Sequence, residues 1–137
     1  MENKKVFSLS FITILVLFSS LFIFAKVNNG EIKEYPLSKI ESKIKSGENI
    51  FVEYSNNSCP YCQKMESVYS ESSKRNRVII YRVELPFNSA KNKFADKYVN
   101  EVPTLIYYKN SKEVRRISGE KSMDSIDDFI TKSKRMW

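Results

Sequence analysis

The chain has 137 residues, with 23 Lys and Arg, 16 Asp and Glu, and no histidine. Its net charge of +7 comes from basic residues scattered among acidic ones, so we expect a solvated surface and no nucleic-acid site. Without histidine, hydrolases that use a Ser-His-Asp triad or a Cys-His pair are excluded, and two cysteines are too few for an ordinary zinc site. No metal or cofactor is therefore expected.

The first predicted element is an apolar segment, Val6–Ala25, which carries no charged residue. Its length matches the roughly 30 Å hydrocarbon core of a bilayer when it is helical. A cleaved signal peptide is the alternative, but Ile23 and Ala25 do not form the small-x-small pattern of a cleavage site. We therefore expect residues 1–27 to be an N-terminal transmembrane helix, with a signal segment as the second interpretation.

Both interpretations place the remainder of the chain outside the cytoplasm. Lys4 and Lys5 precede the apolar segment, and the positive-inside rule then puts the N-terminus in the cytoplasm. We expect a single-pass protein of the cell membrane, or a secreted one if the segment is cleaved, with a linker at 28–31 and one domain at 32–137. That compartment is one in which disulfides form and persist.

The domain alternates between strand-like and helix-like segments. Hydrophobic periodicity and the turn residues predict strands and helices in the order β-α-β-α-β-α-β-β-α, which is an α/β fold. The predicted strands are 32–35, 50–55, 78–85, 104–108 and 113–117, and the predicted helices are 37–46, 60–75, 89–98 and 122–132.

The two cysteines lie in one Cys59-Pro60-Tyr61-Cys62 motif, at the start of the predicted helix 60–75. Unpaired N–H groups and the helix dipole at that end favour a thiolate on Cys59. Cys59 is therefore the candidate nucleophile, and Cys62, one turn later, is the candidate resolving thiol. A purely structural disulfide is less favoured, because a bridge that closes so short a loop constrains the unfolded chain little.

This motif is followed by Val102-Pro103-Thr104, which stands before a predicted strand. The CPYC motif at a helix start together with the later Val-Pro-Thr resembles the thioredoxin superfamily. The resemblance covers about residues 31 to 132 and implies a minimal thioredoxin fold, a central mixed β-sheet flanked by helices. It also implies a protein thiol–disulfide oxidoreductase.

Several residue roles follow from that resemblance. Pro103 is expected to be the cis-proline beside the active site, with Val102 offering backbone groups to substrate. Pro60 and Tyr61 resemble the central dipeptide of glutaredoxins. We expect them to set the stability of the reduced Cys59–Cys62 pair and to contact substrate. Glu53 interrupts an apolar strand at the position where thioredoxins carry a buried acid, so a raised pKa and a role as proton acceptor for Cys62 are expected.

The resemblance has departures. Ser58 replaces the tryptophan that precedes the first cysteine in thioredoxins, and Ser55, Asn56 and Asn57 are expected to make this lip polar. An anchored, minimal protein of this kind is similar to the bacteriocin transport accessory proteins of Gram-positive bacteria.

The expected partners are cysteine-containing exported proteins or peptides, together with a membrane redox partner of unknown identity, and the domain is expected to be monomeric. The alternative function is a Cu(I)-binding module that holds the metal through the Cys59 and Cys62 thiolates without redox turnover. Met65 and Met123 are the thioethers that such a site could add.

Overall fold

A computed structural model describes residues 29–86 and 99–137, which form a five-stranded sheet with three helices. The strands are β1 (Glu31–Glu34), β2 (Ile50–Ser55), β3 (Ile79–Glu84), β4 (Thr104–Lys109) and β5 (Lys112–Ser118), and the helices are α2 (Leu37–Lys45), α3 (Pro60–Asn76) and α5 (Met123–Lys134). The predicted helix at 89–98 and the apolar segment Val6–Ala25 lie outside the described residues. Within those residues, no helix has the length and apolar character to cross a bilayer.

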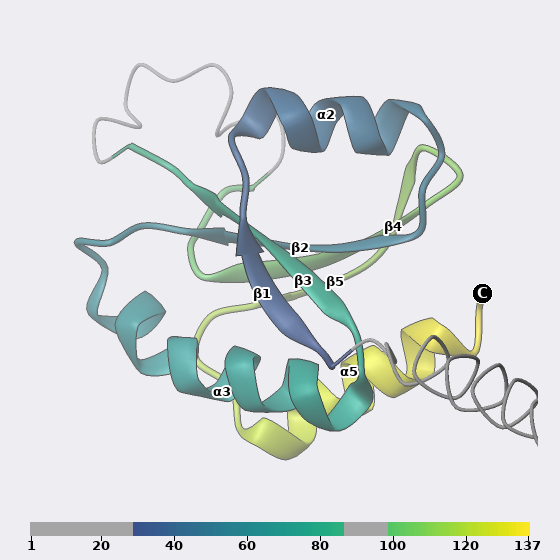
Figure 1. Cartoon of the computed structure of the whole chain (residues 1–137). Coiled ribbons are helices and arrows are strands. Elements are labelled where there is room, and N and C mark those ends of the chain that lie inside the picture. Colours follow the sequence, from purple (N-terminus) through teal and green to yellow (C-terminus); the bar gives the residue numbers. More distant parts are fainter. Residues whose placement is uncertain (1–28, 87–98) are drawn as a thin grey trace, which may run out of the picture.

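The sheet is mixed, as expected from the sequence, with strand order β1-β3-β2-β4-β5. Strands β1, β3 and β2 run parallel, whereas β4 is antiparallel to β2 and β5 is antiparallel to β4. Helix α2 covers one face of the sheet, and α3 and α5 cover the other (Figure 1). Parallel neighbours require helical crossovers, which α2 and α3 provide.

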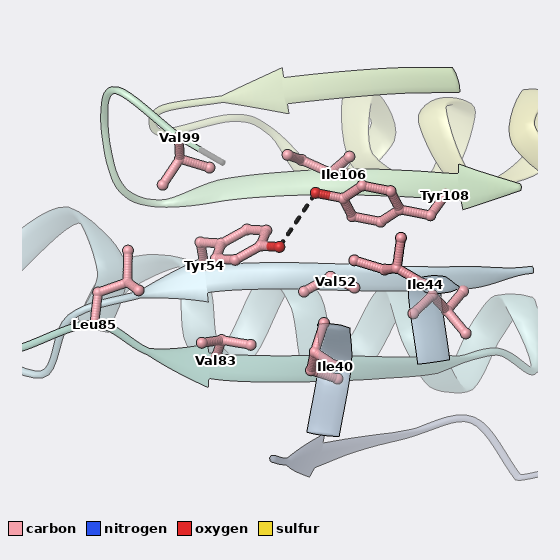
Figure 2. Close-up of a cluster of buried hydrophobic side chains, with 10 residues drawn as sticks. Ile40, Ile44, Val52, Tyr54, Val83, Leu85, Val99, Ile106 and Tyr108 are labelled. Atoms are coloured by element: carbon pink, nitrogen blue, oxygen red, sulfur yellow. Dashed lines mark hydrogen bonds between the residues drawn. The ribbon is translucent and has the colours of Figure 1, made fainter. Parts of the chain in front are cut away.

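Strand β2 is the centre of the core, and every one of its residues is buried. Because side chains alternate along a strand, Val52 and Tyr54 pack on the α2 side, while Phe51 belongs to the cluster on the α3 and α5 side. Figure 2 shows the α2-side cluster, in which the Tyr54 and Tyr108 hydroxyls lie 3.2 Å apart. Glu53 therefore points from the middle of the sheet toward the α3 layer.

Local signals set the ends of the elements near their predicted positions. Pro60 occupies the first turn of α3, where its missing N–H costs no hydrogen bond. The helix ends at Asn76, and its C-cap residue Arg77 has a φ of 54°. Asn110 and Ser111 also have positive φ, which suits the tight turn between β4 and β5. The observed bounds differ from the predicted ones by at most two residues, and β2 has the predicted bounds.

Gly30 fixes the start of β1 against α3. A Cβ atom at Gly30 would lie 1.7 Å from the carbonyl oxygen of Ser73, which belongs to the backbone of the helix. We expect Gly30→Ala to displace β1 or α3 and to cost about 1–3 kcal/mol of stability, as overpacking does. Thermal unfolding followed by circular dichroism measures the loss, and Asn29→Ala, at the exposed neighbouring residue, is the control. Equal melting temperatures for the two variants would contradict this close approach.

Candidate active site

Cys59 and Cys62 form a reduced dithiol at the amino end of α3. Cys59 is the N-cap residue, and its Sγ accepts a hydrogen bond from the backbone N–H of Cys62 at 3.3 Å. Cys59 is partly exposed, whereas Cys62 is 4% exposed. A foreign sulfur can thus approach Cys59, while Cys62 is reached only from within.

Burial raises the pKa of the Cys62 thiol to about 11, and its hydrogen bond with Cys59 acts in the same direction. Cys62 is consequently protonated at neutral pH and needs a proton acceptor before it can attack a mixed disulfide.

The loop before α3 is held by Asn56, one of the three residues that were expected to make this lip polar. Asn56 is only 9% exposed. Its Nδ2 donates to the carbonyl of Leu85 at 2.6 Å, and its Oδ1 accepts from the N–H of Ser58 at 2.8 Å. Its carbonyl accepts from the N–H of Cys59 at 3.0 Å. The side chain therefore ties the nucleophile's loop to the end of β3, while Asn57 and Ser58 are the exposed residues.

The Val102–Pro103 peptide bond is cis, and this loop lies beside the nucleophile. The Sγ of Cys59 is 3.8 Å from the carbonyl oxygen of Val102. The Pro103 carbonyl accepts from the N–H of Gly119 at 2.8 Å, and the Thr104 hydroxyl donates to the Glu101 carbonyl at 2.8 Å. The loop is thus fastened on both sides of the proline. Substrate binding by Val102 and Pro103 stays a prediction.

Two residues of the motif lie at the surface next to Cys59. Pro60 is exposed, and Tyr61 is 56% exposed, with the Lys64 ammonium 5.5 Å from its ring centroid. These positions fit a contact with a docked chain, and their role in substrate binding also stays a prediction.

Glu53 is fully buried in β2, and burial raises its pKa to about 7. Its Oε2 accepts from the Nε of Arg82 at 3.0 Å, and this neighbouring charge opposes part of the increase in pKa. Its Oε1 has no hydrogen-bond partner among the described residues. Glu53 does not face solvent from an edge strand, because β2 is the central strand of the sheet.

Arg82 is a site residue that the sequence analysis missed. It lies opposite Glu53 in the parallel pairing of β2 and β3. Its Nη1 also contacts Glu66 at 3.2 Å, and it lines a groove of about 520 Å³ with Glu66, Gln63 and Ser67. Only the strand pairing reveals this partner, since 29 positions separate the two residues in the sequence.

Tyr69 is a second residue that was missed. It is fully buried, and its hydroxyl has no hydrogen-bond partner in the described part of the chain. Burial raises its pKa, and the nearby charges of Glu53 and Cys62 act in the same direction. Tyr69 therefore interacts electrostatically with both Glu53 and Cys62.

The sequence matches the Thioredoxin family over residues 22–132, which is most of the chain. The protein belongs to the thioredoxin family. Cys59 and Cys62 are accordingly the CxxC pair of a thiol–disulfide oxidoreductase.

A protein disulfide-isomerase of Zea mays is 27% identical to this thioredoxin-family chain over 114 residues. The match covers 80% of this chain but only 22% of the isomerase, so the chain spans about one fifth of that protein's length.

Solved thioredoxins share the fold. Thioredoxin f from spinach chloroplast is 17% identical with a TM-score of 0.64, covering 80% of this chain and 98% of that one. A mutant thioredoxin from Halobacterium salinarum is 17% identical with a TM-score of 0.62, covering 77% and 93%. The thioredoxin of Schistosoma mansoni is 24% identical with a TM-score of 0.58, covering 74% and 97%.

Met65, one of the two methionines considered for a Cu(I) site, packs in the core of this thioredoxin-family domain. Met65 is 1% exposed, and its sulfur accepts from the backbone N–H of Lys121 at 3.4 Å. No observation favours its presentation to a metal at the dithiol.

Proposed function

We propose that the protein exchanges disulfides with cysteine-containing exported proteins or peptides, on the outer side of a membrane to which Val6–Ala25 anchors it. The observation that carries the proposal is the contrast between the two thiols, an accessible Cys59 at a helix start and a buried Cys62 with a raised pKa. One thiol meets substrate and the other completes the exchange. Similarity to bacteriocin transport accessory proteins makes secreted bacteriocins a candidate substrate.

The exchange has two steps. The Cys59 thiolate attacks one sulfur of a substrate disulfide, forms a mixed disulfide and releases the other substrate sulfur as a thiolate. Cys62 then gives its proton to Glu53 and attacks the Cys59 sulfur, which releases the second substrate thiolate and forms the Cys59–Cys62 disulfide. Two electrons pass to the substrate, and the reverse sequence oxidises a substrate dithiol.

The burial and pKa of Glu53 support its role as proton acceptor. A carboxyl whose pKa lies near the operating pH is well matched to accept a proton and to return it. Arg82 holds one carboxylate oxygen and leaves the other without a protein partner among the described residues. We assign Arg82 as a positioning residue for Glu53.

The first test is the reduction potential of the Cys59–Cys62 pair in the full chain, measured by redox-buffer titration and thiol-alkylation mass shift. We expect the pair to equilibrate reversibly. A potential between about −120 and −180 mV would indicate that the protein donates or rearranges substrate disulfides. A potential near about −270 mV would indicate that it reduces them. Cys59→Ser, which cannot form the pair, is the control. A wild-type pair that never equilibrates would remove the enzyme function and favour a structural bridge or metal binding.

A further inference from the structure

Helices α3 and α5 end at the same side of the molecule, where β1 begins (Figure 1). The Nδ2 of Asn76, at the end of α3, donates to Asp127 at 2.8 Å, and its carbonyl accepts from Lys134 at 2.8 Å. The N–H of Glu31 donates to the carbonyl of Val78 at 3.2 Å. The end of the domain that continues toward the N-terminal segment is therefore the end that carries both helix C-termini.

This end gathers three exposed cations and the half-buried Lys134 with exposed apolar side chains. We call it the basic pole, and it consists of Lys74, Arg77, Lys134, Arg135, Met136 and Trp137. Trp137 is 59% and Met136 is 42% exposed, and they are two of the four exposed large hydrophobic residues in the described ranges. The Lys134 ammonium lies 6.0 Å from the Trp137 ring centroid.

The α3 and α5 side-chain carboxylates Glu71, Asp127 and Asp128 are already paired with other cations. Arg75 forms salt bridges with Glu71 and Asp127, and Lys132 forms one with Asp128 at 2.8 Å. Lys74, Arg77 and Arg135 have no carboxylate partner among the described residues. The pole therefore carries excess positive charge.

Helix C-termini alone do not account for this composition. Cations in the last turns of α3 and α5 complement the two helix dipoles. The dipoles offer no reason for an exposed tryptophan and methionine beside those cations. Amphipathic aromatic rings among lysine and arginine are the composition of a membrane–water interface.

The short chain between the segment Val6–Ala25 and the domain also favours a membrane surface as the partner of this pole. Gly30 packs against α3 at this pole, and only residues 26–29 separate it from the end of the segment. That linker reaches about 15 Å at most when fully extended. The linker of an anchored domain is therefore short enough for this pole to reach the bilayer surface.

We propose that the basic pole rests on the anionic lipid headgroups of the membrane and orients the enzyme on it. This inference rests on the anchoring in the proposed function. Cys59 lies at the opposite end of the 17-residue helix α3, about 25 Å from the pole. The dithiol thus faces away from the bilayer, toward exported chains.

Trp137 is the sole tryptophan of the chain and reports directly on this contact. The full chain is reconstituted into phosphatidylcholine vesicles with or without phosphatidylglycerol, and quenching by a lipid spin-labelled near the headgroup is measured. We expect quenching with phosphatidylglycerol, and its loss in phosphatidylcholine alone or at high salt.

The test variant is Lys74→Gln with Arg77→Gln and Arg135→Gln, which should lower the ratio of docked to undocked domain by roughly 100-fold on anionic vesicles. The matched control is Lys39→Gln with Lys64→Gln and Lys121→Gln. These cations lie near the starts of α2, α3 and α5, at the other end of the helices. The control should be quenched like the wild type.

Flotation of the same vesicles separates the two proposals. One outcome is a chain that floats while Trp137 is unquenched, or while both triple variants are quenched equally. Either result contradicts docking of the basic pole on lipid and is compatible with the membrane anchor. A chain that does not float overturns the anchor and the inference that depends on it. The redox titration of the dithiol is independent of either outcome.

Discussion

Replacing Cys62 with serine is expected to stop turnover and to leave substrate attached to Cys59 as a mixed disulfide. Cys59 keeps its place as the N-cap of α3 and its partial exposure, so the first attack remains possible. The attack of Cys62 on the mixed disulfide is lost. Only a thiol from solution can then resolve it, and such a thiol lacks the very high effective concentration of Cys62. We expect turnover to fall by at least roughly 1,000-fold.

The trapped species is read from intact mass and from non-reducing gels, after the full chain is mixed with a disulfide-containing peptide. Cys59→Ser is the paired control, and it should form no adduct because buried Cys62 is only 4% exposed. Adducts of equal yield in both variants would contradict the assignment of nucleophile and resolving thiol. A metal-binding function for the pair would produce no adduct in either.

Glu53 is expected to make the protein less stable as the pH rises through neutrality. Its pKa in the folded protein is about 7, against an ordinary value of 4.5. The folded state therefore binds the proton more tightly than the unfolded chain. The stability that this provides is fully present below the unfolded pKa and is lost as pH rises past the folded one. The loss amounts to about 3 kcal/mol.

Glu53→Gln should remove most of this dependence, because a neutral amide can still accept from Arg82 and does not ionise. Denaturant unfolding at a series of pH values between about 5 and 9 measures the effect. Glu71→Gln, at an exposed carboxylate on α3, should keep the wild-type profile. Identical pH profiles for wild type and Glu53→Gln would show that the buried carboxyl does not titrate in this range.

Glu53→Gln should also slow resolution of the mixed disulfide by about 100-fold at neutral pH while leaving its formation unchanged. Quenched-flow alkylation separates the two steps. Arg82→Gln should move the pH midpoint of resolution upward, because the Arg82 charge lowers the pKa of Glu53. An unchanged resolution rate in Glu53→Gln would take the carboxyl out of the mechanism, even if the stability profile shifted.

Much of this site was predictable from short stretches of sequence. The CPYC motif identified both thiols, and Pro60 indicated where α3 begins. Alternation and turn residues located the described strands, since a strand's pattern depends on near neighbours. Val102–Pro103 and Glu53 were found only through resemblance to a family, because a lone proline or glutamate is compatible with many environments.

The sequence by itself determined which residues could do chemistry and roughly which helix or strand each would occupy. The tertiary structure decided how those elements come together. Strand order makes β2 central and sets Glu53 against Arg82, and the loop approach brings the Val102 carbonyl to 3.8 Å from Cys59. Asn56 appeared to be one more polar turn residue, yet it is buried because the end of β3 offers it the Leu85 carbonyl. These contacts join residues 29 to 43 positions apart. Local periodicity extends over only a few residues, so it carries no information about them.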